Sequence, residues 1–304
     1  MKPPLVSICI PAYEAEALIA ETLASVRAQT FQDWEVIVTE DGSKDRTEAL
    51  VNEFAKTVTQ PVIYNRHEKN QGLPRTRNTG IKTARGAWIA WLDADDLWRN
   101  DHLEALIAKA KTADGELVFS GSLLFESDSK KAVGVRAPTE EHLRALPLSL
   151  YMGWLSVMPS AVLILRSAFE RYGLVSVDYP YVNDTEYWLR VMRGGGRIGY
   201  SGEISCLYRQ HTNAMSRRAA EMNEDSARLC ENYAAWSAIP PRYKRKRPAD
   251  LYRWASNASI SKNPGQALRF IGKSLRADPL NLRSALSLPR VVAYCVFQRR
   301  KTAG

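Results

Sequence analysis

An apolar run that ends abruptly in three carboxylates, WIAWLDADD, occupies residues 88–96. The run has the length and composition of a buried strand. Because unpaired acids are costly to bury, we expect the three at its end to face a cation. In extended backbone the side chains of Asp93 and Asp95 would point to the same side, where two carboxylates suit a hard divalent ion, Mg²⁺ or Mn²⁺. The alternative is a solvated acidic turn that caps a helix starting near Asn100.

Strand-like and helix-like segments alternate before this run. Strands are expected at 5–10, 34–39, 62–65 and 86–92, and helices at 16–29, 45–58 and 73–83. This alternation is typical of a parallel sheet built from strand–helix–strand units. Pro11 is expected to end the first strand. Ligands of such sheets bind beyond the carboxyl ends of the strands, and polar segments at 11–14, 41–42 and 93–96 all follow such ends. The sequence therefore predicts an α/β fold with one ligand-binding rim.

The rim carries no standard loop for binding phosphate. Neither a glycine-rich dinucleotide fingerprint nor a Walker lysine loop follows the first strand. A nucleotide diphosphate bound here would therefore need a metal ion, which the acidic run could hold. Arg77 lies near the start of the helix expected at 73–83, where free N–H groups and the helix dipole favour anions. We expect Arg77 to contact a phosphate or a ribose, and the alternative is a solvent-exposed charge on an amphipathic helix.

Four motifs follow one another along the chain: Pro11-Ala12-Tyr13; Asp41-Gly42-Ser43-x-Asp45-x-Thr47; Asn70-x-Gly72 with Arg77-Asn78-x-Gly80; and Leu92-Asp93-Ala94-Asp95-Asp96. In this order and spacing they resemble the family 2 glycosyltransferases, inverting enzymes with the GT-A fold. The resemblance implies an α/β, GT-A-type, mostly parallel sheet flanked by helices. It implies a nucleotide-sugar-binding and catalytic domain at 1–215, followed by a basic helical C-terminal region at 216–304.

The resemblance also implies a donor site for a nucleotide-diphosphate sugar, with UDP-sugars the first candidates. The residues implied to contact the donor are Pro11, Ala12, Tyr13, Glu14, Asp41, Gly72, Arg77 and Asp93. In the family the acid at the position of Asp93 holds ribose, and the acid at the position of Asp95 holds the metal. Glu14, Glu40 and Thr76 depart from the residues usual in the family, Asn, Asp and Ala, so the identity of the donor stays open.

A further helix is expected where Tyr187, Trp188 and Val191 would anchor it and leave Asp184 in its first turn. In the family the corresponding segment supplies the general base, so the resemblance implies that Asp184 is the base. Glu186 is expected to support it or to raise its pKa. A helix-capping role is the alternative for Asp184.

His211 ends the segment Tyr208-Arg209-Gln210-His211, which matches a Tyr-Arg-x-His pattern of the family. The resemblance implies that His211 contacts the metal or the diphosphate. The alternative is a structural histidine that only donates or accepts hydrogen bonds.

The last quarter of the chain holds all of the excess positive charge. From residue 236 to the end there are 15 Lys and Arg against 2 Asp and Glu. Basic amphipathic helices with Tyr252, Trp254 and Tyr294 suit an anionic leaflet. We therefore expect 236–304 to contact a membrane surface, with packing on the catalytic domain as the alternative and no nucleic acid as partner. A single helical hairpin is expected here, with a helix start at Asn263-Pro264.

Composition narrows the class of protein further. The scattered cysteines favour a reducing compartment over a disulfide framework or a zinc site. Neither a signal-peptide pattern nor an 18-residue apolar window is present, so we expect a cytoplasmic protein, peripheral on the inner face of the cell membrane. The prediction is a metal-dependent, inverting glycosyltransferase that acts on a glycan or lipid-linked acceptor in cell-surface polysaccharide synthesis.

Two alternatives from other classes stay open at this point. A nucleotidyltransferase would need a basic phosphate-gripping loop after the first strand, and the acidic segment 11–16 counts against it. A catalytically silent protein that only keeps the fold is the second alternative, and the presence of Asp93, Asp95 and Asp184 counts against that one.

Overall fold

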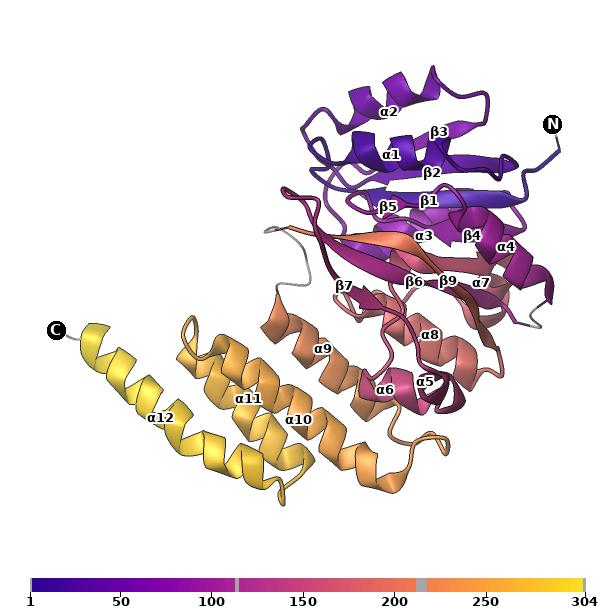
Figure 1. Cartoon of the computed structure of the whole chain (residues 1–304). Helices are drawn as coiled ribbons and strands as arrows, with labels where there is room; N and C mark the ends of the chain where they lie inside the picture. The colour runs from indigo at the N-terminus through magenta and orange to yellow at the C-terminus, as the bar shows by residue number, and fades with distance from the viewer. Residues whose placement is uncertain (1, 113–114, 212–217, 303–304) are drawn as a thin grey trace. The chain divides into compact units, whose positions relative to one another are not determined.

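The computed structural model describes residues 2–112, 115–211 and 218–302 (Figure 1). The chain divides into two compact units. The first comprises Met1–Leu146 and Gly153–His211 and is built on a nine-stranded sheet. The second comprises Pro147–Met152 and Thr212–Gly304, and its described elements are helices.

The sheet has the strand order β3-β2-β1-β4-β8-β6-β9-β5, with β7 beside β6. The strands are β1 (Val6–Ala12), β2 (Trp34–Glu40), β3 (Val62–Arg66), β4 (Trp88–Trp91), β5 (Leu97–Trp98), β6 (Leu117–Glu126), β7 (Ala132–Arg136), β8 (Val162–Leu165) and β9 (Ile198–Gln210). Neighbours among β1 to β4 are parallel, as the alternating pattern predicts, and β6 is parallel to β9. The pairs β4–β8, β6–β8, β6–β7 and β5–β9 are antiparallel, so the later part of the sheet is mixed.

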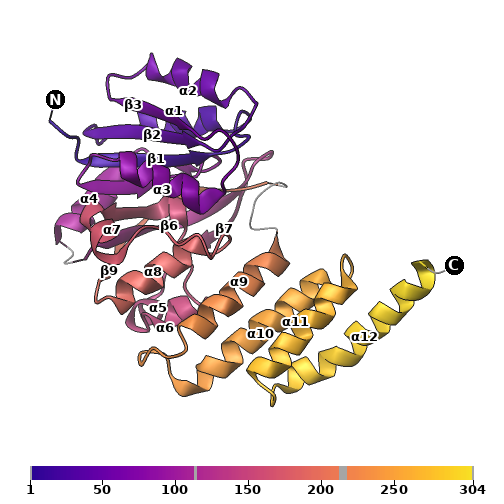
Figure 2. The ribbon, with the colours of Figure 1, turned by 180° about the vertical axis from the view of Figure 1, so that it is seen from behind.

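The helices of the first unit cover both faces of the sheet. They are α1 (Ile19–Arg27), α2 (Thr47–Ala55), α3 (Leu73–Thr83), α4 (His102–Thr112), α5 (Glu140–Arg144), α7 (Arg166–Tyr172) and α8 (Asn183–Arg193), with a 3₁₀ turn η1 (Pro159–Ala161). The chain steps outward from β1 to β3 and then returns to place β4 on the other side of β1. Right-handed crossovers therefore put α1 and α2 on one face and α3 on the other (Figures 1 and 2).

The prediction that Pro11 ends the first strand is wrong. The strand includes Pro11 and ends one residue later, at Ala12. The carbonyl of Cys9 accepts a hydrogen bond from Leu92 N (3.1 Å), so the nitrogen of Pro11, two residues later, faces the same neighbouring strand. That neighbour, β4, has already ended at Trp91. The missing N–H of Pro11 therefore costs no hydrogen bond between strands.

An aromatic cluster joins the end of β4 to α8. The buried ring of Trp91 lies 6.1 Å from Tyr187 and 5.3 Å from Trp188, centroid to centroid, and 6.2 Å from Phe169 of α7. Because Tyr187 and Trp188 belong to α8, the cluster fixes the first turns of that helix beside the end of β4. The expectation that these two aromatic residues anchor the helix is confirmed.

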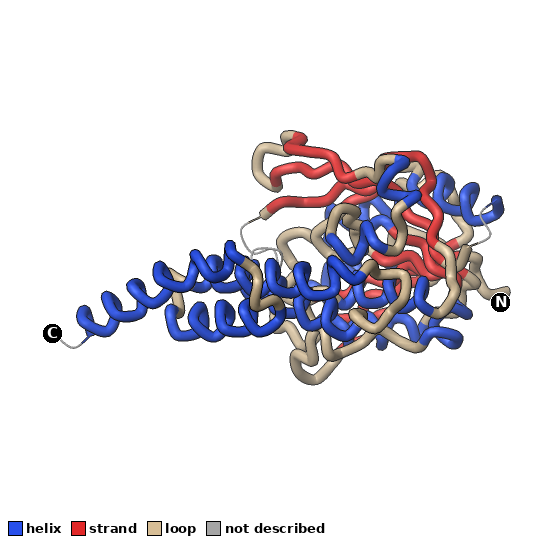
Figure 3. Tube along the Cα trace, turned by 90° about the horizontal axis from the view of Figure 1, so that it is seen from below, coloured by secondary structure: helices blue, strands red, loops and turns tan. Residues whose placement is uncertain are grey.

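The second unit contains α6 (Leu148–Met152), α9 (Ala219–Asn232), α10 (Pro241–Ser259), α11 (Pro264–Ala277) and α12 (Leu282–Thr302). The last four pack in sequence, each on the next, as the side-by-side helices near the C-terminus in Figures 2 and 3 show. The expectation of a single hairpin in 236–304 is therefore wrong, because α10 forms there in addition to α11 and α12. None of the described helices has the length and hydropathy of a membrane span.

The helix start predicted at Asn263-Pro264 is confirmed. The side chain of Asn263 accepts a hydrogen bond from the backbone nitrogen of Gln266 at 3.0 Å, and Pro264 occupies the first turn. This satisfies one of the N–H groups that a helix start leaves without a partner.

Candidate active site

The acidic run after β4 forms a turn. The backbone nitrogen of Asp96 donates to the carbonyl of Asp93 at 3.1 Å, which closes a four-residue turn. The expectation that Asp93 and Asp95 lie in extended backbone is therefore wrong. Their side chains have different partners. Asp93 pairs with Arg77 at 2.8 Å, and Asp95 lies 2.9 Å from Nε2 of His211. Both carboxylates keep partial contact with solvent, with 24% and 37% of their side chains exposed.

The third acid of the run, Asp96, is buried beneath the other two. Its carboxylate accepts hydrogen bonds from Oγ of Ser160 (2.6 Å) and from the backbone nitrogen of Arg209 (2.9 Å). Burial raises the pKa of Asp96 well above its ordinary value, and the charges of Asp95 and Asp93 add to the rise. Since Ser160 also accepts a hydrogen bond from Asp93 N at 3.0 Å, Asp96 ties η1 and β9 to the turn.

Arg77 links the acidic turn to α8. Its guanidinium donates to Asp93 (2.8 Å) and to Oδ1 of Asn183 (2.6 Å), and it lies over the ring of Trp91 at 4.9 Å. The side chain is only 2% exposed, and its Nε has no hydrogen-bond partner. Arg77 is therefore a buried cation that joins two segments of the site. The alternative of a solvent-exposed charge on an amphipathic helix is wrong, and contact of Arg77 with a phosphate or a ribose stays a prediction.

Asp184 lies in the first turn of α8, next to the residue that Arg77 holds. Its carboxylate accepts a hydrogen bond from the backbone nitrogen of Thr185 at 2.6 Å. Burial is the largest influence on the pKa of Asp184 and raises it, the positive charge of Arg77 lowers it, and the negative charge of Asp93 raises it again. The charges of Arg77 and Asp93 therefore both act on the carboxyl group of Asp184.

Glu186, expected to support Asp184, forms an ion pair with Arg190 one turn later, with Oε2 2.9 Å from the guanidinium. Arg190 also donates to the carbonyl oxygens of Tyr172 (2.5 Å) and Leu174 (2.8 Å). This network fixes α8 against the end of α7.

A second cluster lies at the ends of β1 and β2. The carboxylate of Asp41 accepts hydrogen bonds from the backbone nitrogens of Gln71 (2.9 Å) and Gly72 (2.8 Å) and lies 2.7 Å from Nδ1 of His67. The Asp41 nitrogen in turn donates to the carbonyl of Ala12 at 2.9 Å. The buried Asp41 therefore holds the loop that leads into α3, and Gly72 begins that helix with a φ of 89°.

The motif Ser43-x-Asp45-x-Thr47 has a direct structural explanation. These three side chains accept hydrogen bonds from the backbone nitrogens of three successive residues, 14, 15 and 16, at 2.8, 3.2 and 2.9 Å for Ser43, Thr47 and Asp45 respectively. The loop after β1 is thereby fixed to the loop after β2. Tyr13, which lies in that loop, is 49% exposed, and Glu14 has a positive φ of 47°.

We expect Gly42→Ala to destabilise the first unit. A Cβ atom at Gly42 would lie 2.7 Å from backbone atoms of Lys69 and 2.8 Å from the nitrogen of Asn70, and φ is +83°. Gly202 has a similar φ of +89° but no neighbouring atom within 4 Å, so Gly202→Ala is the matched control. In urea unfolding, Gly42→Ala should cost about 1–3 kcal/mol more than the control, because it adds steric overlap to the same backbone strain. Equal losses would contradict the close approach of the two loops.

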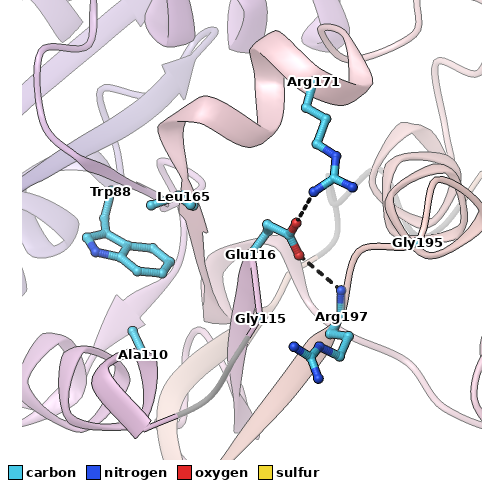
Figure 4. A pocket seen from close by; sticks show the side chains of 8 residues that line it. All are labelled: Trp88, Ala110, Gly115, Glu116, Leu165, Arg171, Gly195 and Arg197. Atoms are coloured by element: carbon cyan, nitrogen blue, oxygen red, sulfur yellow. Dashed lines mark hydrogen bonds and ion pairs between the residues drawn. The ribbon is translucent and has the colours of Figure 1, made fainter.

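A cavity of about 460 Å³ lies elsewhere in the first unit (Figure 4). Its lining includes Trp88, where β4 begins, and Glu116, which pairs with Arg171 at 2.9 Å. Asp93 follows the carboxyl end of β4, so this cavity lies at the amino end of that strand, away from the acidic turn. It does not include the acids at the carboxyl ends.

The family model for glycosyl transferase family 2 matches residues 7–173, which run from β1 to the end of α7 and contain both clusters of loop residues and the acidic turn. The chain belongs to glycosyl transferase family 2. It is therefore a glycosyltransferase, as predicted, and the class of nucleotidyltransferases is set aside.

Curated relatives agree with the family. The glucosyltransferase WfgD of Escherichia coli, named for transfer from UDP-Glc to α-D-GlcNAc-diphosphoundecaprenol in β-1,3 linkage, is 30% identical over 215 residues, which cover 70% of this chain and 79% of the relative. An uncharacterized glycosyltransferase of Rickettsia typhi is 28% identical over 242 residues, which cover 78% and 71% of the two chains.

Solved structures of other glycosyltransferases share the fold. Residues 1–349 of Staphylococcus aureus TarS in complex with UDP-GlcNAc superpose with a TM-score of 0.65 at 16% identity, over 96% of this chain and 87% of that one. A mannosyltransferase of Pyrobaculum calidifontis in complex with GDP-Man and Mn²⁺ superposes with a TM-score of 0.64 at 19% identity, over 99% and 83%. The predicted GT-A-type fold of this family 2 enzyme is confirmed.

Sequence reasoning missed several side chains that position the site. Ser160 supports the acidic turn, and His67 connects Asp41 to Oγ1 of Thr79 at 2.9 Å. Asn183, the residue before Asp184, is a hydrogen-bond partner of Arg77. The sequence gives little indication of these residues. A polar residue next to an apolar run, such as Ser160 before β8, is a weak signal of this kind.

Proposed function

We propose that this enzyme transfers a sugar from a nucleotide-diphosphate sugar to an acceptor hydroxyl with inversion at the anomeric carbon. The observation that carries the proposal is the arrangement around Arg77. The guanidinium of Arg77 donates hydrogen bonds to both Asp93 and Asn183. Asp93 follows the end of β4, and Asn183 directly precedes Asp184. A donor-side acid and a candidate base thus belong to one site, although they are far apart in the sequence.

The donor is proposed to lie across the ends of β2, β1 and β4. Tyr13 and Glu14, with the backbone of Pro11 and Ala12, would border the base, together with the loop that Asp41 fixes to Gly72. Asp93 would face the ribose, and Arg77 would position Asp93 from behind. UDP is the preferred nucleotide, because the Escherichia coli relative is named for UDP-Glc and the TarS structure contains UDP-GlcNAc.

Asp184 is proposed as the general base. It would take the proton from the acceptor hydroxyl while the hydroxyl oxygen bonds to the anomeric carbon and the bond from that carbon to the nucleoside diphosphate breaks. A single displacement of this kind needs one base and no enzyme nucleophile. A carboxyl with a raised pKa is a stronger base than an ordinary one, which suits this role.

A divalent metal, Mn²⁺ or Mg²⁺, is proposed to be held by Asp95 and His211, with Asp93 beside them. Among the described residues no group of three or more His, Cys, Asp or Glu could hold a metal unaided. One half-exposed carboxylate and one imidazole nitrogen still fit an ion that takes its remaining ligands from diphosphate and water. When bound, the ion would stabilise the negative charge of the leaving diphosphate.

The acceptor is proposed to be a membrane-proximal glycan or a lipid-linked sugar. The Escherichia coli relative is named for a diphosphoundecaprenol-linked acceptor. The excess of basic residues from 236 onward supports a location at the inner face of an anionic cytoplasmic membrane.

The test of this function is release of UDP from UDP-glucose and UDP-GlcNAc in the presence of Mn²⁺, with and without a GlcNAc-diphospho-lipid acceptor. We expect acceptor-dependent release and a product whose new linkage is of inverted configuration by NMR. Retention of configuration, or release of pyrophosphate, would overturn the proposal.

We expect Arg77→Met to move the acidic limb of the pH–activity profile to higher pH. The base must be deprotonated, so activity is lost as the pH falls through the pKa of Asp184. Removing the positive charge of Arg77 removes the largest of the influences that lower this pKa, so activity should fall at a higher pH than in the wild type. Arg77→Lys keeps the charge and is the control.

The measurement is the kcat profile over a pH range of about 5 to 9. An unchanged profile in Arg77→Met would show that Arg77 has only a structural role. Thermal unfolding of both variants separates a shifted profile from loss of folded enzyme.

A further inference from the structure

Helix α12 is apolar on two opposite sides. On its inner side Val291 is 1% exposed and packs with Ala267 and Ile271 of α11, and Leu288 lies partly buried beside them. On its outer side Leu282 and Leu286 are 76% and 79% exposed. A helix that packs on one neighbour normally places polar residues on its outer side.

The outer residues form a continuous stripe along the helix. Leu282, Leu286, Pro289, Ala293 and Val296 are spaced by four, three, four and three residues, which places them on one face. All five are exposed, including Val296 at 48%. Figure 1 shows α11 on one side of α12 and, among the described elements of this unit, none on the other.

The charges beside this stripe are all of one sign. Arg283 and Arg290 are exposed on one flank of it, and the sequence has no Asp or Glu after Asp278. A two-fold contact between copies of this chain through the stripe would bring the same arginines close to one another, which is unfavourable. An apolar layer bordered by negative charge would bury the leucine side chains and pair with the two arginines.

We propose that the outer face of α12 docks on the surface of an anionic phospholipid bilayer, with the helix lying in the plane of the membrane. Leu282, Leu286 and Val296 would enter the boundary between headgroups and acyl chains, and Arg283 and Arg290 would contact lipid phosphates. The proposal deepens the proposed function and rests on it to the extent that a lipid-linked acceptor requires the enzyme at a membrane. It assigns the contact to one helix face.

The test is flotation of the full chain with vesicles of phosphatidylcholine alone or mixed with phosphatidylglycerol. We expect binding to the mixed vesicles and at least about tenfold weaker binding by the double variant Leu282→Gln, Leu286→Gln, because two inserted side chains are lost. The control is Val133→Gln, Val135→Gln, which replaces residues of β7 that are 51% and 54% exposed. The control should bind as the wild type does.

Charge is tested separately. The double variant Arg283→Gln, Arg290→Gln should bind mixed vesicles about tenfold more weakly at low salt and should lose most of the preference for phosphatidylglycerol. Wild-type binding by either α12 double variant would overturn the proposal. So would a concentration-dependent dimer, seen by sedimentation equilibrium, that the leucine substitutions abolish while vesicle binding is absent.

Activity on a water-soluble acceptor keeps this proposal distinct from the proposed function. The α12 variants should retain wild-type UDP release with such an acceptor, because none of the substituted residues lies in the first unit. If the wild type binds vesicles but transfers no sugar, the proposed function fails and the docking surface stands. If it transfers sugar but does not bind vesicles, the docking proposal alone is overturned.

Discussion

Asp184→Asn is expected to lower kcat by about 10²- to 10⁴-fold, the range that a well-placed general base contributes. The substitution keeps the shape of the side chain and its acceptor oxygen for Thr185 N, so the first turn of α8 should persist. It removes the group that accepts the proton of the acceptor hydroxyl. Binding of UDP should change little, because the donor is proposed to sit on the other side of Arg77. Steady-state kinetics with UDP-sugar and acceptor, together with UDP binding by calorimetry, measure both effects.

The control for Asp184→Asn is Asp178→Asn, which removes an exposed acid six residues earlier and should leave kcat unchanged. If Asp184→Asn keeps kcat within about tenfold of the wild type, Asp184 acts only as a partner of the dipole of α8, whose N-cap residue is Val182, and the base lies elsewhere. Loss of UDP binding with loss of activity would point instead to a collapsed site. The two readouts together decide between a missing base and a damaged fold.

The bounds of α3 could be predicted from the sequence because its signals are local. Gly72 and Pro74 mark its start, and the predicted range 73–83 is the range observed. The orientation of the helix was harder to predict. A Cβ atom added at Gly80 would lie 3.4 Å from the Cβ of Cys9 and 3.4 Å from Oγ1 of Thr39, so the face that also carries Arg77 is turned to the sheet. A charged residue near a helix start could equally be a solvent-exposed charge on an amphipathic helix, and the packing of α3 rules out that alternative for Arg77.

The acidic turn shows a different limit. Three carboxylates at a strand end could be recognised from residue types and spacing alone, and so could the alternation that puts them at the rim. Their partners could not, because Arg209 and Ser160 are separated from Asp96 by 113 and 64 residues. Such contacts depend on how β8, β6 and β9 follow one another beyond β4 in the mixed part of the sheet. The alternating pattern predicts only the parallel part.

Asp95→Asn is expected to abolish most of the metal-dependent activity, with a loss of about 10²- to 10⁴-fold in kcat/KM, since stabilisation of the leaving group by a metal is worth several kcal/mol. Asp95 is the most exposed carboxylate of the turn, and its partner His211 is 19% exposed, so both can turn toward an ion. The amide is a much weaker metal ligand than the carboxylate. The control is Asp101→Asn, which removes an exposed acid paired with Arg99 and should have no effect.

A binding measurement separates a metal ligand from a residue that only shapes the turn. In the wild type, Mn²⁺ should strengthen UDP binding by at least about tenfold, because Asp95 and His211 would hold the ion where it attracts the negatively charged diphosphate. In Asp95→Asn this enhancement should disappear while UDP binding without metal stays as in the wild type. The backbone carbonyl of Asp95 still accepts the hydrogen bond from Nε of Arg209 (2.6 Å) after the substitution, so the turn keeps this anchor. An undiminished effect of Mn²⁺ on UDP binding in Asp95→Asn would exclude Asp95 as a metal ligand and leave His211 and Asp93 as the candidates among the residues proposed here.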